Sequence, residues 1–508
     1  MPRSGKNRKV LSNDDSWILH FRNPVTPEIM WDEMIEPHVG SAIDGFIWSS
    51  GAYTYNFETE IGELSDSRSP GNLEQFIEKY DGPLSVIPKL CRKAGMDFFP
   101  SFRMNQHYDS DMTDKLRLEH PEYLINRGKE PLKGSMEWGI GRGLDFSFEE
   151  VRKMKADVIL ETIERFDVDG VELDFMRHPG YFKVEQAISN AYLITDMVKY
   201  IRDGMDKLGE INNKKYDLIV RVPASFSASL GIGLDVETWI EEDLVDIVVA
   251  GGGFIPFDSP IHEFVQKASS KNIHIFGCLE GLRPAVDQLT LRAIAANYWN
   301  QGIDGIHLFN LYSMSASWKQ NELKELSSPD KLKHLDKRYE RDRSYSRFGT
   351  ASHLHMSFRN GIPKTQLPLA IETTLTNQTA DVEINVADDI EDAISKNILA
   401  DCELELLFDG FNDDEISVSI NNRNLNWDDA ITDPNGWDFV HYKADTNWNY
   451  YPSQLDKKND EGYCAKWTLS SELIKSGINT IQIKMIKPDS SRIDSLILNN
   501  VRLSIKYN

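Results

Sequence analysis

The sequence predicts a (β/α)8 barrel followed by a C-terminal antiparallel β-sandwich. Eight short apolar runs recur between residues 17 and 313, most of them separated by stretches with helical periodicity. This is the pattern of a parallel sheet covered by helices, and eight strands close a barrel. From about residue 346 the helical periods give way to alternating apolar and polar residues, which is typical of antiparallel strands. We therefore expect a barrel domain over residues 1–345 and a sandwich over residues 346–508.

Each apolar run is a candidate barrel strand, bounded by turn residues or by a helical pattern. The eight candidates occupy residues 17–24, 42–51, 96–107, 168–179, 216–226, 244–254, 272–281 and 302–313. Before the fourth, Ser147 and Glu150 have capping-box spacing, and the apolar residues that follow share one helix face. We expect that helix to cover the barrel exterior, and the aromatic insertion over residues 108–144 to form a loop over the mouth.

The charge balance argues against polyanionic partners. The chain has 56 Lys and Arg against 80 Asp and Glu, so its net charge is -24. Such a field repels phosphate backbones and anionic lipid surfaces, and we expect neither nucleic acid nor membrane as a partner. The chain as written starts without the apolar stretch of a signal peptide, which predicts a cytoplasmic protein, or a periplasmic or secreted one if a leader has been removed.

The four cysteines are Cys91, Cys278, Cys402 and Cys464, and they are scattered along the chain. None has the CxxC spacing or the histidine companions of a zinc site, so we expect buried thiols, no metal and no cofactor.

Two acids on the fourth candidate strand carry the strongest chemical signal. In VDGVELDFMRHP, Glu172 and Asp174 are two residues apart and therefore share a face, while Val171 and Leu173 share the other. The alternation places both acids inside the barrel, with Asp174 nearer the mouth, where the active sites of such barrels lie. An ionised carboxylate is costly to bury unless it has a partner or a shifted pKa. The two acids therefore either pair with barrel arginines or take part in catalysis.

Glu280 is the second candidate catalytic acid. It ends the seventh candidate strand just before a glycine, and its side chain is expected on the same face of that strand as His274, Phe276 and Cys278. Cleavage of a glycosidic bond needs one group to protonate the leaving oxygen and a second to attack or to activate water, and two carboxyl groups across a barrel mouth supply that pair. We predict Asp174 and Glu280 as the pair, with Glu172 as a supporting acid.

Other polar and aromatic residues near the predicted strand ends are candidate substrate contacts. Arginines bind carboxylate and sulfate groups, so a surplus over the inward acids would favour an anionic sugar. Amides and histidines bind sugar hydroxyls, and aromatic rings stack on sugars or pack the loops. The candidates are His20, Arg22, Trp48, Arg103, Asn105, His107, Trp138, Arg177, His178, Arg221 and Asn310.

Several motifs resemble bacterial barrel proteins described as family-ten-like glycoside hydrolases. They are DVDGVELDFMRHP, WGIGRGLDFSFEEVR and GLDVETWIEEDLVDIVVAGG, and the resemblance covers roughly residues 15 to 320. It implies a (β/α)8 fold and action on a poly- or oligosaccharide. Glu280 matches the strand-seven nucleophile of classical clan A glycosidases, but the fourth strand lacks their Asn-Glu pair. It is also similar to the chitinase DGxDxDxE pattern up to Asp174, with Met176 in place of the acid. An Asp nucleophile on strand four, as in several α-glycosidase families, would reverse the two roles.

Three alternatives to a glycoside hydrolase stay open. The first is a carbohydrate-binding barrel that does not cleave, and the second is a polysaccharide lyase acting on uronates. The third is a metal-dependent hydrolase, which usually carries an HxH pair on its first strand, where this chain offers only His20. The sandwich has three candidate roles: carbohydrate binding, support of the barrel, and formation of a homo-oligomer.

Overall fold

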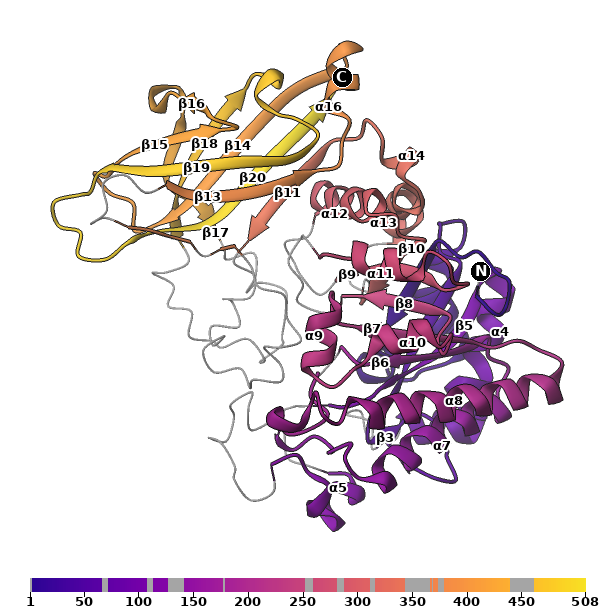
Figure 1. The fold of residues 1–508 in the computed structure, drawn as a ribbon. Coiled ribbons are helices and arrows are strands. Elements are labelled where there is room, and N and C mark those ends of the chain that lie inside the picture. Colours follow the sequence, from indigo (N-terminus) through magenta and orange to yellow (C-terminus); the bar gives the residue numbers. More distant parts are fainter. Residues whose placement is uncertain are drawn as a thin grey trace.

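The computed structural model shows two domains side by side, a barrel and a sandwich (Figure 1). It describes residues 2–65, 72–106, 113–126, 141–176, 179–251, 259–280, 287–310, 316–342, 366–367, 369–372, 379–438 and 461–508. Within these residues, no helix has the length and apolar character needed to cross a bilayer. All four cysteines are buried and free, as expected.

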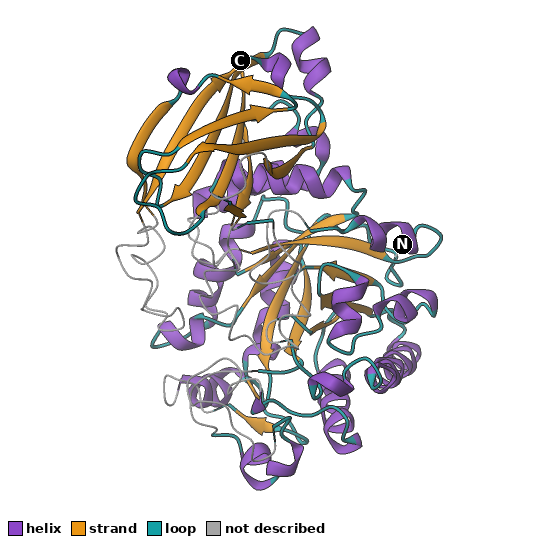
Figure 2. Ribbon diagram, turned by 60° about the vertical axis from the view of Figure 1, so that its left-hand side comes forward, coloured by secondary structure: helices purple, strands orange, loops and turns teal. Residues whose placement is uncertain are grey.

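The first domain is a closed barrel of eight parallel strands enclosed by helices (Figure 2). β1 pairs with both β2 and β10, which closes the sheet. In spatial order the strands are β1 (Val10–Asp14), β2 (Gly45–Gly51), β5 (Asp97–Arg103), β6 (Gly170–Asp174), β7 (Asp217–Val222), β8 (Ile247–Ala250), β9 (His274–Glu280) and β10 (Gly305–Phe309). The short strands β3 (Thr54–Tyr55) and β4 (Glu63–Leu64) extend from β2. The predicted fold class is confirmed.

The first predicted strand is wrong, whereas the other seven each contain a barrel strand. Residues 17–24 include a short helix, α1 (Ile18–Phe21), and the true first strand is β1, with the sequence VLSND. The segment was overlooked because three of its five residues are polar, yet all five are buried. Asn13 faces the barrel interior, and the chain then turns at Asp15 and Ser16 before α1 begins.

Helices follow most barrel strands and cover the sheet. α7 confirms the predicted helix, although its N-cap is Phe148, with no side-chain cap, in place of Ser147. α7 spans Glu149–Arg165. The other α-helices in the described part of the chain are α2 (Pro27–Met30), α3 (Asn72–Tyr80), α4 (Pro83–Ala94), α5 (Lys115–Glu119), α8 (Ala191–Asn212), α9 (Phe226–Gly231), α10 (Val236–Glu241), α11 (His262–Ala268), α12 (Gln288–Asn300), α13 (Ala316–Asn321), α14 (Pro329–Leu332) and α16 (Ile390–Ser395).

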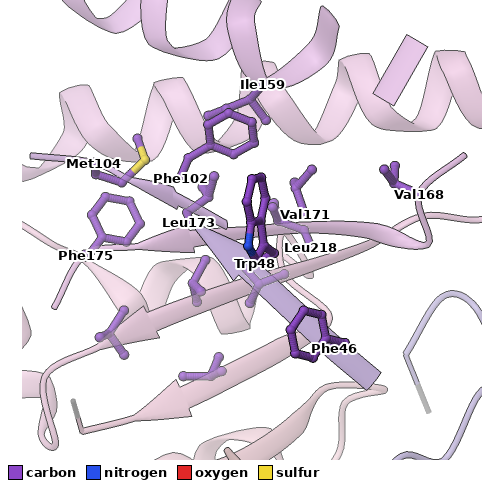
Figure 3. Packing of buried hydrophobic residues seen from close by; sticks show 14 of the residues in the cluster. Phe46, Trp48, Phe102, Met104, Ile159, Val168, Val171, Leu173, Phe175 and Leu218 are labelled. Carbon is purple, nitrogen blue, oxygen red and sulfur yellow. The ribbon is translucent and has the colours of Figure 1, made fainter. Parts of the chain in front are cut away.

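Alternate residues of each strand face two different cores. The outer core, between sheet and helices, contains Phe46, Val171 and Leu173, while a smaller inner cluster contains Ile47 and Phe99. Trp48 belongs to the outer core and is fully buried there (Figure 3). The prediction that Trp48 contacts substrate is therefore wrong, because its position on β2 turns the indole towards the helices.

An ionic cluster closes the barrel at the N-terminal ends of its strands. Arg8 is 3% exposed and binds Asp97 and Asp217, the first residues of β5 and β7, at 2.7 Å each. Ser4 also bonds to Asp217, through its backbone N–H and its hydroxyl. The segment before β1 thus seals the floor opposite the mouth.

The second domain is a β-sandwich of two antiparallel sheets. One sheet has the order β11 (Lys337–Asp342), β20 (Leu496–Tyr507), β14 (Leu399–Asp409), β18 (Glu461–Leu469), β17 (Ile431–Asp438), with β12 (Leu369–Ile371) also beside β20; the other is β13 (Thr379–Val386), β19 (Gly477–Lys487), β15 (Glu415–Ile420), β16 (Arg423–Leu425). Because β11 pairs along β20, the sandwich begins before residue 345, where the sequence placed the boundary.

We predict that replacing Arg8 with Met destabilises the barrel by ~3 kcal/mol, because Asp217 is fully buried and loses its charged partner. Urea unfolding followed by tryptophan fluorescence measures the change. Lys6→Met is the matched control: Lys6 also binds Asp97, but its side chain is 47% exposed, so we expect a loss below ~1 kcal/mol. Equal losses in the two variants would show that burial of the Arg8–Asp217 pair does not determine the loss of stability.

Candidate functional site

Charged and amide side chains gather where the barrel strands end, on the side opposite the Arg8 floor. β1, β5, β6 and β10 end at or beside Asp15, Arg103, Asp174 and Asn310, respectively. The C-terminal ends of parallel strands form the active face of barrels of this class. This layer is therefore the candidate site.

Asp174 and Arg221 form a buried, two-pronged ion pair between β6 and β7. Arg221 donates from Nε to Oδ1 of Asp174 at 2.9 Å and from Nη2 to Oδ2 at 2.8 Å. The backbone N–H of Met176 also donates to Oδ1, at 3.0 Å. Burial lowers the pKa of Arg221, but Asp174, Cys278 and Glu172 together outweigh that effect and raise this pKa well above its ordinary value. The Asp174 carboxylate is thus held by charge-assisted bonds.

A ring from β10 supports the guanidinium of Arg221. The Arg221 Cζ atom lies 3.8 Å from the centroid of the Phe309 ring. Phe309 belongs to the apolar cluster inside the barrel, so the cation sits on an aromatic face in a water-poor setting. Arg221 is 0% exposed and lies in register with Asp174 on the neighbouring strand, so it holds the Asp174 carboxylate from the side.

A second polar layer lies one step deeper in the barrel, around Glu172. Its Oε1 accepts from Ser101 Oγ at 2.7 Å and from Asn13 Nδ2 at 3.1 Å, and its Oε2 lies 2.8 Å from His307 Nε2. His307 Nδ1 lies 3.7 Å from Cys278 Sγ. Glu172 and His307 are both 0% exposed. Glu172 is thus engaged with the chain itself, below the level of the mouth.

The rim of the mouth holds a further ion pair, which the sequence analysis missed. Arg103 Nη2 lies 2.5 Å from Asp15 Oδ1, and Asn310 Nδ2 donates to Asp15 Oδ2 at 2.6 Å. Both charged side chains keep about a tenth of their surface exposed, Arg103 11% and Asp15 8%. Asp15 escaped notice because the first strand was placed too late. His307 was missed because the apolar run GIHLF conceals one inward polar residue.

Asn105 links the loops that wall the site. Its Nδ2 donates to the carbonyl oxygens of Leu144 and Gly180, while its Oδ1 accepts from the Leu144 N–H and from the Tyr53 hydroxyl. The side chain is 1% exposed and its hydrogen-bonding capacity is filled. The prediction of Asn105 as a sugar ligand is therefore wrong, because three loop segments use all of its polar atoms.

The other predicted contacts fall into two groups. His20 lies on α1, and Arg22 follows it with 46% of its side chain exposed and Glu33 bound at 2.7 Å. The second group, which lies outside the described residues, consists of His107, Trp138, Arg177 and His178. Glu280 is the last residue of β9 and pairs in register with Phe309, but its side chain also lies outside the description.

Comparison with known proteins yields loose structural likenesses only. No protein-family model matches the chain, and no curated protein matches it in sequence. An endo-beta-1,4-mannanase from Thermotoga petrophila overlaps 99% of this chain and 99% of its own, with 10% identity and a TM-score of 0.44. Alpha-L-fucosidase isoenzyme 2 from Paenibacillus thiaminolyticus overlaps 63% of this chain and 49% of its own, with 10% identity and a TM-score of 0.41.

The galactosidase domain of the alpha-galactosidase-sucrose kinase AgaSK overlaps 95% of this chain, with 14% identity and a TM-score of 0.38. This chain spans only 55% of that protein, about half its length. Likenesses this loose say nothing about substrate or mechanism. They also give no support to the resemblance to family-ten-like proteins.

A buried carboxyl beside the rim gives the site a pH-dependent element. Asp14 closes β1 and is 4% exposed. Burial raises the pKa of Asp14 to about 7; Asp15 adds to the rise, while Lys319 and the N–H groups of Trp17 and Ser16 oppose it. In an unfolded chain this pKa is ~3.9. The folded protein therefore holds a proton between about pH 4 and pH 7 that the unfolded chain does not.

We predict that Asp14→Asn stabilises the protein relative to wild type more at pH 8 than at pH 5. The wild type loses stability as pH rises through this window, whereas Asn keeps an oxygen for the Trp17 N–H and does not titrate. Thermal melting of both proteins at the two pH values tests this. Asp32→Asn, at an exposed carboxylate, is the control, and its stability relative to wild type should be the same at both pH values. A difference that shrinks at pH 8 contradicts the prediction.

Proposed function

We propose that this protein is a glycoside hydrolase, with Asp174 and Glu280 as its catalytic carboxylates. The observation that supports this most is the ion pair of Asp174 with Arg221 at the mouth end of β6. The active sites of such barrels lie at this end of the strands. An acid that a buried arginine already holds there is preorganised for catalysis.

The contacts of Asp174 suit an anionic role in the reaction. Its carboxylate accepts three hydrogen bonds, two from a guanidinium and one from the Met176 N–H. Because both carboxylate oxygens are held by fixed donors, we assign Asp174 to stabilising charge and assign proton donation to another group. In our proposal its negative charge faces the anomeric carbon and stabilises the positive charge that develops there as the glycosidic bond breaks.

Glu280 takes the complementary role of general acid. It ends β9, and two strands, β7 and β8, lie between β9 and β6 in the barrel. A protonated Glu280 donates its proton to the glycosidic oxygen, and the departing sugar leaves as an alcohol. A water molecule completes hydrolysis at the anomeric carbon and restores the proton to Glu280.

The deeper layer positions these groups. Glu172 binds three neighbours across the barrel interior, and it precedes Asp174 by two residues on β6. We assign Glu172 to holding β6 in place, because its oxygens are bonded to the chain and none of its surface is exposed.

The pairing of the arginines favours an uncharged sugar over a uronate or a sulfated sugar. Among the described residues, Arg22, Arg103 and Arg221 were candidates for binding substrate anions. Each has a carboxylate partner, respectively Glu33, Asp15 and Asp174. A guanidinium that already donates to a protein carboxylate has fewer N–H groups left to bind a ligand anion. We therefore propose a neutral poly- or oligosaccharide as substrate.

The second candidate function is a barrel that binds carbohydrate without cleaving it. It is favoured by the burial of Asp174, which is 2% exposed and engaged through both oxygens. In that case the Asp174–Arg221 pair would only stabilise the barrel. Rim groups such as Asp15 and Arg103 would then hold the sugar.

We predict that Glu280→Gln and Asp174→Asn each lower hydrolysis of neutral oligosaccharides by at least ~10²-fold, the lower range for loss of an acid or base group. Product release from a panel of neutral and uronate-containing oligosaccharides provides the assay, and calorimetric binding of the same sugars accompanies it. Asp203→Asn, at an exposed carboxylate on α8, is the control and should keep full activity.

The outcomes separate the two candidates. Products from wild type and none from the two variants support the hydrolase. Binding without products in any protein supports the non-catalytic barrel. Turnover by Asp174→Asn or Glu280→Gln at the wild-type rate removes that residue from the mechanism. Unsaturated products would identify a lyase instead.

A further inference from the structure

The rim pair of Asp15 and Arg103 faces the barrel interior. Ser101, two residues before Arg103 on β5, donates to Glu172 inside the barrel. Asn13, two residues before Asp15 in the chain, donates to the same carboxylate. Residues two apart in a strand share a face, so Arg103 points inward as Ser101 does, and its contact with Asp15 brings that acid to the same side. The pair thus lies at the mouth, beyond the layer of Glu172.

Charges alternate in sign across the ends of four barrel strands. Arg103 on β5 is in register with Asp174 on β6, and Asp174 is in register with Arg221 on β7. Together with Asp15 after β1, the series is acid, arginine, acid, arginine. Asp174 and Arg221 are almost fully buried, whereas the side chains of Arg103 and Asp15 are 11% and 8% exposed. Of these four residues, the rim pair therefore offers the most surface to a ligand.

Asn310 adds an unpaired acceptor beside the rim pair. It follows β10 with a positive φ of 58° and is 0% exposed. Its Nδ2 donates to Asp15 Oδ2 at 2.6 Å, while its Oδ1 is buried and has no hydrogen-bond partner among the described residues. A buried acceptor of this kind costs free energy unless a donor reaches it. Because the oxygen and the nitrogen of an amide lie on one planar group, that donor would bind next to Asp15.

The chemistry of these three side chains matches neighbouring hydroxyl groups. A carboxylate only accepts hydrogen bonds and a guanidinium only donates them, whereas a hydroxyl group does both. Asp15 and Arg103 touch each other, so two groups bound to them at the same time must themselves be neighbours. Adjacent hydroxyls of a sugar ring meet this condition, with one donating to Asp15 and the other accepting from Arg103. An anionic substituent would instead be repelled by the Asp15 carboxylate.

We propose that Asp15, Arg103 and Asn310 form a subsite that binds two neighbouring, unsubstituted hydroxyl groups of a neutral sugar ring. The inference deepens the proposed function and rests on it for the choice of a sugar as ligand. It assigns these residues to substrate specificity, because a site built to bond a hydroxyl group discriminates against an analogue that lacks it. A sugar that is methylated or acylated at these positions would not fit.

The test measures binding of neutral sugars to the full chain by calorimetry. The probes are thio-linked tetrasaccharides of glucose, mannose, galactose and xylose, which resist hydrolysis, and the monodeoxy derivatives of the one that binds wild type most tightly. We expect loss of either of two neighbouring hydroxyls to raise Kd by at least about tenfold, the lower range for a hydrogen bond to a charged group.

Two variants assign the hydroxyls to their protein partners. In Asp15→Ala the parent sugar should bind at least about tenfold more weakly, and the derivative that lacks the hydroxyl bound by Asp15 should bind within about threefold of the parent. Arg103→Met should abolish discrimination at the neighbouring position. A purely structural role would weaken the parent and its derivatives by the same factor, so the ratio of their Kd values separates the two cases. Arg103→Met also keeps the test decisive if Asp15→Ala folds poorly.

Asp97→Ala is the matched control. Asp97 lies at the other end of β5, its side chain is 14% exposed, and it accepts from Arg8 Nε at 2.7 Å. It is thus a slightly exposed carboxylate in an ion pair, as Asp15 is, but on the floor side of the barrel. The variant should melt at a lower temperature than wild type and keep the wild-type ratios of Kd between parent and derivatives.

Each outcome counts for or against the inference. Unchanged ratios in Asp15→Ala and Arg103→Met overturn the subsite and leave the proposed hydrolase intact. A wild type that tolerates the loss of every hydroxyl, or that senses only positions that are not neighbours, overturns it as well. Failure to bind any of the four tetrasaccharides overturns the choice of a neutral sugar. If the oxygen-linked sugars bind to wild type without being cleaved, the proposed hydrolysis fails, while the ratios still decide whether the subsite exists.

Discussion

The buried ion pair of Asp174 with Arg221 is the interaction on which the candidate site depends. Removing two charges from water costs several kcal/mol per ion, and the cost is recovered only with good geometry and further hydrogen bonds. Here the guanidinium lies on the Phe309 face and reaches both carboxylate oxygens, and a backbone N–H adds a third bond. The result is a negative charge fixed at a strand end. Such a charge suits a reaction in which positive charge develops on the substrate.

The barrel interior supports this charge layer by layer. The Arg8 cluster closes the floor, the apolar inner residues follow, Glu172 and His307 lie above them, and Asp174 stands at the mouth. Every charged member of these layers has a partner, so the interior carries polar groups without large unpaired costs. This arrangement also limits the choice of mechanism. Arg221 is occupied by Asp174 and the Glu172 carboxylate is enclosed by its neighbours, so the proposed hydrolysis needs its proton donor elsewhere at the mouth.

The sequence predicted the fold well, because burial leaves a periodic trace in the apolar residues. Seven of the eight strands and the helix α7 follow from that trace. β1 was missed, since its polar residues are buried by pairing with other polar groups, which periodicity does not record. The same alternation correctly placed Glu172 and Asp174 inside the barrel, but it did not reveal their partners, which come from β1, β5, β7 and β10. Trp48 and Asn105 were misassigned because the sequence does not show whether an aromatic or amide side chain near a strand end faces a ligand, a helix or a loop.

The position of the sandwich follows from the two faces of the barrel helix α12. A barrel helix buries one face against the strands and leaves the other face to water or to a neighbour. α12 uses both faces, because the sandwich contributes an apolar contact at Ala293 and polar contacts at Asp287, Thr290 and Asn297. Contacts of this mixed kind fix orientation more strongly than apolar burial alone, since hydrogen bonds depend on direction. A domain attached in this way holds α12 in one orientation as well as adding stability.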